Sequence, residues 1–151
     1  YQIANFILHY LNIFLIFVPM LLGGLIYIFY RPLNLKMFSW FASLKLLDSI
    51  LQIRELIYKK SINLPKWIVY SLPNALWVFS GIITFQFIWK ENITQLVFWV
   101  SLFSFISVMF ELLQLWNIIP GNFDICDIVL IIISIILANI YHFWLLKQED
   151  I

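Results

Sequence analysis

Three carboxylates lie close together in a chain that is otherwise mostly hydrocarbon. Glu111, Asp124 and Asp127 fall within the stretch FELLQLWNIIPGNFDICD, residues 110–127, and Gln114 lies between them. Carboxylate and amide oxygens are the ligands that suit Ca²⁺ or Mg²⁺. The same groups could handle protons, engage a lipid-linked head group, or fix the register of two helices. We favour the structural role first, and a head-group or cation site second.

The rest of the chain offers few other groups for chemistry. It contains two histidines, His9 and His142, and one cysteine, Cys126. This set excludes an intramolecular disulfide and a multi-cysteine metal site, and no Ser-His-Asp arrangement stands out. The sequence leans against an enzyme without deciding the question. It indicates no cofactor beyond the divalent cation that the acids could hold.

The composition describes a protein whose solvent is lipid. Of the 151 residues, 64% are hydrophobic and 11% are charged, and the mean hydropathy is +0.96. A soluble domain of this length needs more polar surface than these residues supply. The formal net charge is +1, so nothing points to nucleic acid as a partner. We predict one all-α membrane domain spanning residues 1–151.

Four apolar runs are long enough to cross a bilayer, since its hydrocarbon core of about 30 Å needs roughly 20 residues of helix. Trp67 and Trp89 bracket one of them, as expected of side chains that prefer the interface. Short polar or Pro-Gly turns separate the later runs. The expected spans are residues 3–30, 67–89, 93–116 and 125–146.

The segment from 33 to 60 is apolar but carries a polar stripe. Its polar residues recur at 3-4-3-4 spacing, which places them on one face of a helix. Burying two of them, Lys45 and Asp48, at mid-membrane would cost about 3 kcal/mol each. We therefore favour an amphipathic interfacial helix around 37–58 over a fifth crossing. The stripe consists of Lys45, Asp48, Gln52, Glu55 and Lys59.

Glu111 lies near the end of the predicted span 93–116, inside or at the edge of the hydrocarbon. Acids there are costly and usually face a partner or a wet cavity. Gln114 shares its face, and the short turn that follows makes the two flanking helices antiparallel neighbours. We therefore expect Glu111, Gln114, Asp124 and Asp127 to form one polar cluster. The simpler alternative is that the aspartates cap the last helix and Glu111 snorkels or is protonated.

Two further sets of polar residues have plain explanations. Asn74 follows Pro73 and is expected to bond the backbone that the proline frees, with a cleft-lining role as the minority interpretation. The basic residues set the topology and contact anionic lipid, or dock a partner subunit. This basic patch consists of Arg31, Lys36, Arg54, Lys59, Lys60 and Lys66.

The order of these residues resembles the signature of the VanZ-like membrane protein family. An earlier segment, LPNALWVFSGIITF (72–85), is similar to a family helix that begins with Asp or Asn, and Asn74 stands in that place. The resemblance covers about residues 67–140. It rests on Phe110-Glu111, Gln114, Gly121, Asp124-Ile125 and Asp127, which lie in order between two spans.

The resemblance implies a multi-pass protein of the bacterial cytoplasmic membrane. The family is named for an accessory protein of glycopeptide resistance that is linked to reduced teicoplanin sensitivity. Our first hypothesis is a non-enzymatic accessory or assembly subunit, in a membrane complex or at the envelope surface, with membrane lipid and a membrane-protein subunit as its candidate partners. The alternative is an enzyme or binder for a lipid-linked or glycopeptide-related ligand. That version would use Glu111, Asp124 and Asp127 with a divalent cation.

The orientation stays open at this point. Most of the Lys and Arg residues lie between Arg31 and Lys66, which favours a cytoplasmic location for that segment. With four spans, the Pro120-Gly121 turn would lie on the same side. The family resemblance instead implies that this turn faces outward.

Overall fold

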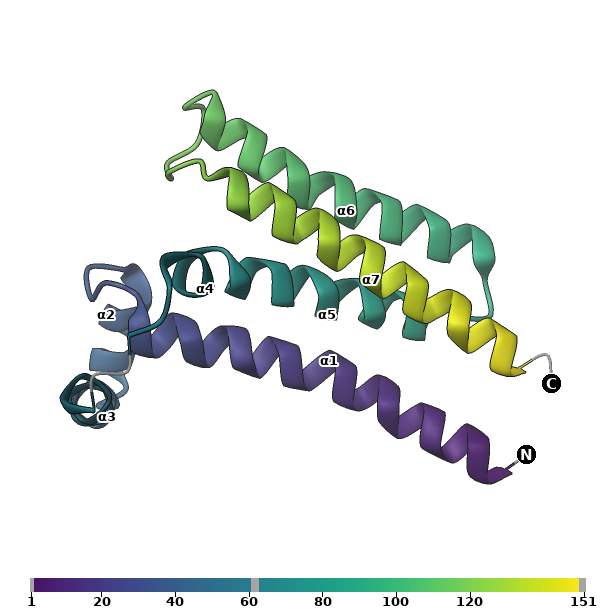
Figure 1. The fold of residues 1–151 in the computed structure, drawn as a ribbon, viewed down its shortest axis with the longest axis horizontal. Helices are drawn as coiled ribbons and strands as arrows, with labels where there is room; N and C mark the ends of the chain where they lie inside the picture. Colours follow the sequence, from purple (N-terminus) through teal and green to yellow (C-terminus); the bar gives the residue numbers. More distant parts are fainter. Residues whose placement is uncertain (1, 61–62, 150–151) are drawn as a thin grey trace.

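A computed structural model describes residues 2–60 and 63–149 of the chain. Every regular element within these ranges is a helix, which confirms the predicted all-α class (Figure 1). The elements are α1 (Gln2–Tyr30), α2 (Lys36–Ser43), α3 (Leu47–Lys59), α4 (Lys66–Tyr70), α5 (Leu72–Ile88), α6 (Ile93–Leu115) and α7 (Ile125–Glu149).

Three of these helices are long and apolar enough to cross a membrane. The qualifying segments are Leu8–Tyr30, Ile93–Leu115 and Ile125–Lys147, each 23 residues long. At 1.5 Å per residue, each reaches about 34 Å, slightly more than the hydrocarbon core. The chain is therefore an all-helical membrane protein with three such helices. The remaining apolar helix, α5, has 17 residues and is shorter.

The predicted single helix 67–89 is instead divided into α4 and α5. The two helices meet at Ser71, whose backbone N–H donates to Trp67 O and whose carbonyl accepts from Ala75 N. Pro73 follows directly, in the first turn of α5. Because proline has no N–H and restricts the residue before it, the helix cannot continue regularly through this point. The proline thus separates the two helices at a buried serine.

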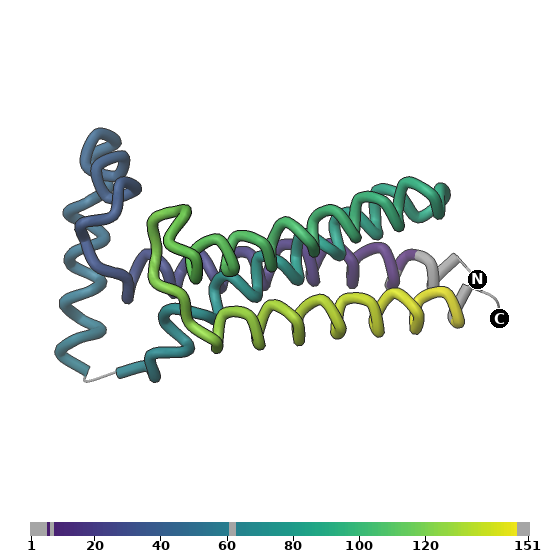
Figure 2. The backbone as a smooth tube through the Cα atoms, turned by 90° about the horizontal axis from the view of Figure 1, so that it is seen from above, coloured from purple at the N-terminus to yellow at the C-terminus, as the bar shows by residue number. Residues whose placement is uncertain are grey.

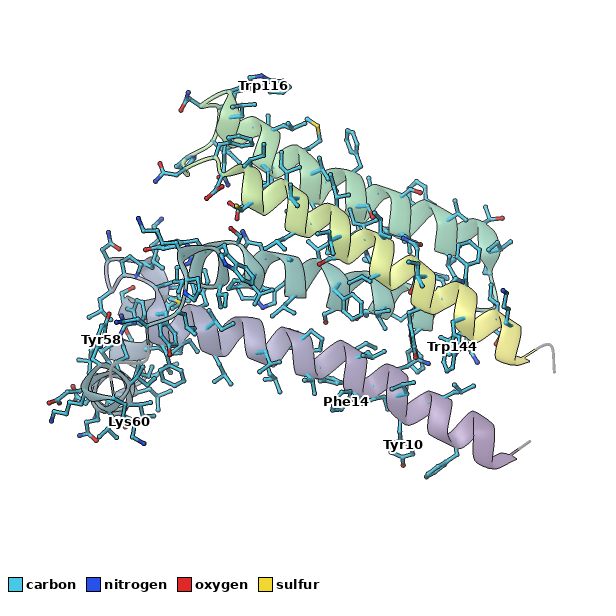
Figure 3. All side chains as sticks on the ribbon, in the orientation of Figure 1. Tyr10, Phe14, Tyr58, Lys60, Trp116 and Trp144 are labelled. Carbon is cyan, nitrogen blue, oxygen red and sulfur yellow. The ribbon has the colours of Figure 1, made fainter. Side chains whose placement is uncertain are left out.

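α5 is the central helix of the bundle. It packs against α1 on one side and against α6 and α7 on the other (Figure 1). The most completely buried apolar side chains lie at these contacts, including Ile82 and Ile83 of α5 and Ile131 and Ala138 of α7. Elsewhere the outer faces are apolar and exposed, as with Tyr10 and Phe14 on α1 (Figure 3). A bundle with its large apolar side chains turned outward is the pattern expected in lipid.

Hydrogen bonds tie α1 to the rest of the bundle. Trp77 Nε1 donates to Met20 O at 3.1 Å, and Tyr141 Oη donates to Asn12 Oδ1 at 3.0 Å. Without a hydrophobic drive between helices in lipid, such bonds contribute about 0.6–2 kcal/mol each to association. They fix how α1 lies along α5 and α7.

The predicted single helix 37–58 is likewise two helices. α2 ends in a Schellman turn, in which Leu46 N donates to Phe41 O and Lys45 N donates to Ala42 O. Lys45 adopts the left-handed conformation at φ 58°, so it does not belong to the polar stripe. The rest of the stripe, Asp48, Gln52, Glu55 and Lys59, is exposed on α3.

α3 lies across the end of the bundle rather than along it (Figure 2). Its 13 residues are too few to cross the hydrocarbon core. Arg54 anchors it to α1, because Arg54 Nη1 donates to Ile28 O at 2.8 Å and its guanidinium lies 5.5 Å from the Phe38 ring centroid. This buried side chain does not contribute to the exposed basic patch that the sequence predicted.

Candidate functional site

The candidate site lies at one end of the bundle, where ends of five helices are gathered. These are the C-terminal end of α1, the joint between α4 and α5, the C-terminal end of α6 and the N-terminal end of α7 (Figures 1 and 2). α2 and α3 lie at the same end of the molecule, and both chain termini lie at the other. Helix ends of this kind expose the backbone to the interfacial region of a bilayer.

Glu111 and Asp127 lie within electrostatic range of each other at this end. Glu111 is in the last turns of α6 and retains 4% of its accessible surface, and Asp127 is in the first turn of α7 and retains 7%. The short turn between the helices brings them together, as the sequence led us to expect. We refer to Glu111 and Asp127 as the carboxylate pair.

Ser71 joins the carboxylate pair from the joint between α4 and α5. Its side chain is fully buried and lies close enough to act on the Asp127 carboxylate, although the two form no hydrogen bond of standard geometry. Among the described residues, three buried oxygens here have no hydrogen-bond partner: Glu111 Oε2, Asp127 Oδ1 and Ser71 Oγ. We call these atoms the acceptor set. Each such atom costs about 1–3 kcal/mol while it stays unsatisfied.

Arg31 supplies the positive charge that acts on Asp127. Its guanidinium does not form an ion pair with the carboxylates in the described part of the chain. It lies instead 4.9 Å from the Tyr27 ring centroid and 4.7 Å from that of Tyr70, and Nη2 donates to Tyr70 O at 2.8 Å. These contacts hold the cation beside the carboxylate pair without neutralising it by direct contact.

Asp124 performs the capping role that the sequence offered as one interpretation. Its Oδ1 accepts from the backbone N–H of Cys126 at 2.9 Å, which is the bond of an N-cap residue to the second residue of its helix. Its side chain is exposed, in contrast to the carboxylate pair. The three acids therefore form a series that runs from solvent into the bundle.

Gln114 is engaged with the turn between α6 and α7. A Cβ atom added to Gly121 would come within 2.7 Å of Gln114 Oε1, so the amide lies directly against the glycine. α6 ends in a second Schellman turn, with Asn117 at φ 55° and Ile118 N donating to Leu113 O. Gln114 thus helps to fold the loop that connects the two acidic helix ends.

The other predicted polar residues take no part in this site. Asn74 is half-buried on α5, and its side chain makes no hydrogen bond with any described residue. The expected bond from Asn74 to the backbone freed by Pro73 is therefore absent. The lysines of the basic patch, Lys36, Lys59, Lys60 and Lys66, are exposed.

The geometry does not assemble a site for a divalent cation. Within residues 2–60 and 63–149, no three His, Cys, Asp or Glu side chains are placed so that they could hold one metal ion. The physical reason is that Asp124 is turned outward to cap α7. The carboxylate pair is left with Ser71 and Arg31 as its polar neighbours.

Sequence reasoning found the carboxylate pair but missed Ser71 and counted Arg31 only as part of the basic patch. A signal for Ser71 existed, because it is a polar residue directly before Leu72-Pro73 in an apolar run. No sequence signal linked Arg31 to Asp127. Comparison of the chain with protein families, curated proteins and solved structures gave no match.

Proposed function

We propose that the chain crosses the membrane four times, with α4 and α5 acting together as one crossing. The two helices follow each other with only Ser71 between them, and together they match the length of the three long helices. An even number of crossings agrees with both termini lying at one end. α3 then lies in the interface, where its exposed polar stripe meets head groups and water.

We propose further that the protein is a non-enzymatic accessory or assembly subunit of the VanZ-like kind in a bacterial cytoplasmic membrane. It would engage a partner or a head group at the bilayer surface through its carboxylate pair. The observation that carries this proposal is the acceptor set, because buried oxygens without a protein partner call for an external one. The ordered series Glu111, Gln114, Gly121, Asp124 and Asp127 supports the family resemblance.

A second candidate function is a binder for a lipid-linked ligand. The same unsatisfied acceptors favour it, since a fully paired cluster would serve only to hold the helices together. The version of this candidate that uses a divalent cation has no support from the placement of the acids.

The proposed role in the envelope is tested by drug sensitivity. The full chain is expressed in a teicoplanin-sensitive bacterium, and the inhibitory concentration of teicoplanin is measured. We expect the wild type to raise it severalfold and Glu111→Gln to abolish the increase. Glu91→Gln is the matched control, because Glu91 is an exposed acid at the other end of α6. An unchanged inhibitory concentration, with the protein shown to be in the membrane, would refute the role.

A further inference from the structure

The carboxylate pair brings two acids together beside one cation. Glu111 and Asp127 are more than nine-tenths buried, and Arg31 acts on Asp127. When both acids are ionised, two carboxylates against one guanidinium leave one negative charge in a region where water cannot screen it. A single monovalent cationic group would balance this charge.

The acceptor set also indicates that the cation should carry hydrogen-bond donors. Glu111 Oε2, Asp127 Oδ1 and Ser71 Oγ are three buried oxygens from α6, α7 and the α4–α5 joint. None has a hydrogen-bond partner of standard geometry, although the Ser71 hydroxyl lies close enough to act on the Asp127 carboxylate. A primary ammonium group carries three N–H donors and no acceptor. It supplies both the positive charge and the N–H donors that these groups lack. A quaternary ammonium has the same charge but no N–H to donate.

The depth of the site matches that of a lipid head group. Glu111 lies about one turn, or roughly 6 Å, before the end of α6, which is within reach of the polar layer of a bilayer. Trp67 and Tyr70 are exposed on α4, and Trp116 is exposed at the end of α6 (Figure 3). Aromatic side chains of this kind are typical of an interfacial belt. A cation arriving here comes from the head-group layer.

Asp124 extends the negative charge of the site to the surface. It is exposed at the start of α7 and within electrostatic range of both members of the carboxylate pair. Negative charge therefore continues from the surface to the buried oxygens. A cationic group would be attracted first at Asp124 and then held more strongly inside, where the dielectric constant is lower.

We propose that Glu111, Asp127 and Ser71 bind the primary ammonium of a phospholipid head group, as found in phosphatidylethanolamine. This inference rests on the proposed function and names the chemistry of the group that the carboxylate pair engages. Arg31, held by Tyr27 and Tyr70, sets the charge of the site so that one monovalent cation completes it.

The test compares two lipids of equal head-group charge, one with three N–H donors on its nitrogen and the other with three N-methyl groups in their place. The full chain is reconstituted in phosphatidylglycerol vesicles that contain equal amounts of phosphatidylethanolamine and phosphatidylcholine. The protein is then extracted in mild detergent, and its bound lipids are quantified by mass spectrometry. We expect bound phosphatidylethanolamine to exceed phosphatidylcholine severalfold. Equal amounts of the two lipids would overturn the proposal, and this comparison needs no variant to fold.

Variants locate the preference within the molecule. The double variant Glu111→Gln with Asp127→Asn should bind the two lipids equally, whereas Glu91→Gln should retain the wild-type preference. Helical circular dichroism and gel filtration verify that each variant is folded. A folded double variant that still prefers phosphatidylethanolamine would overturn the assignment to these residues.

A final arm separates the lipid from a soluble amine. Free ethanolamine is added to the lipid-free protein in detergent, and the thermal midpoint is compared with that after adding phosphatidylethanolamine. A larger shift with the lipid supports a head-group site, and an equal shift overturns it. The drug test is independent of these results. A protein that prefers phosphatidylethanolamine but leaves teicoplanin sensitivity unchanged would refute the proposed function and keep the site.

Discussion

Glu111 illustrates how one residue can destabilise the folded state and still serve to bind a ligand. Its carboxylate is buried near Asp127, and one of its oxygens lacks a hydrogen-bond partner. A buried charge without compensation lowers the stability of the folded state. Such a cost is common where a protein binds a ligand that supplies the missing partner.

We therefore expect Glu111→Gln to stabilise the lipid-free protein. The amide removes the repulsion with Asp127 and supplies N–H donors, for a gain of about 1 kcal/mol or more. Thermal unfolding in detergent without phosphatidylethanolamine measures the change. Glu91→Gln should stay within about 0.5 kcal/mol of wild type, because its ion pair with Lys90 is exposed. Destabilisation by Glu111→Gln would show that the carboxylate already has a stabilising partner.

Gly121 shows how a single backbone position shapes the loop beside the site. It has φ +153°, and a Cβ atom there would meet Gln114 Cδ at 2.6 Å. We expect Gly121→Ala to lower stability by about 1–2 kcal/mol, mainly through the backbone, since the glutamine can swing aside. The measurement is again thermal unfolding in detergent.

Gly24→Ala is the matched control for this change. Gly24 lies inside α1, and nothing lies within 4 Å of an added Cβ. Alanine should be neutral there or gain up to about 1 kcal/mol. Equal losses at Gly24 and Gly121 would show that the strain at Gly121 is not the cause.

At the scale of elements, the helices break for two different reasons. Pro73 separates α4 from α5 because it lacks an N–H. Between α2 and α3 there is neither proline nor glycine, and the break is a Schellman turn with Lys45 in the left-handed region. A lysine there pays about 1–2 kcal/mol relative to glycine. The hydrogen bond from Arg54 Nη1 to Ile28 O holds α3 across the bundle after this turn.

Lys45→Gly should therefore stabilise the protein by about 1 kcal/mol. Glycine adopts the left-handed conformation readily and keeps the hydrogen bonds of the turn. Lys60→Gly is the control. It removes the same positive charge, at the end of α3, but Lys60 has φ −80° and is not in the left-handed region. We expect no gain there. If Lys45→Gly also gave no gain in thermal unfolding, the turn would not be strained.

At the scale of the whole molecule, the arrangement makes a prediction about topology. Residues 63–65, directly before α4, and the α6–α7 turn lie at the same end, opposite both termini and the α5–α6 turn (Figure 1). On a Cys126→Ser background, single cysteines at Asn63 and Asn122 should react with an impermeant maleimide from one side of the membrane. A cysteine at Glu91 should react only from the other side.

Intact cells and inverted vesicles provide the two sides. Labelling of Asn63→Cys and Asn122→Cys from the outside would agree with the family resemblance, and labelling from the inside would agree with the positive-inside rule. Labelling from opposite sides would contradict four crossings and would show that α4 and α5 do not form a crossing together.

The sequence by itself determined that the protein is an all-helical membrane protein and that Glu111 and Asp127 lie close together. Runs of more than 20 apolar residues form helices in lipid because every backbone group must be bonded within its own segment. This reason is local, so α1, α6 and α7 could be predicted. The short turn after Trp116 likewise made Glu111 and Asp127 neighbours without knowledge of the rest of the fold.

Only the tertiary structure decided which polar groups complete the site. Arg31 and Ser71 come from segments far from Asp127 in the chain, and α5 brings them together by packing against both α1 and α7. The same packing buried Arg54 and set α3 across the bundle. Contacts between distant helices depend on how whole helix faces pack together. Hydrophobic periodicity within one segment does not determine which faces pack, so these contacts could not be predicted from the sequence.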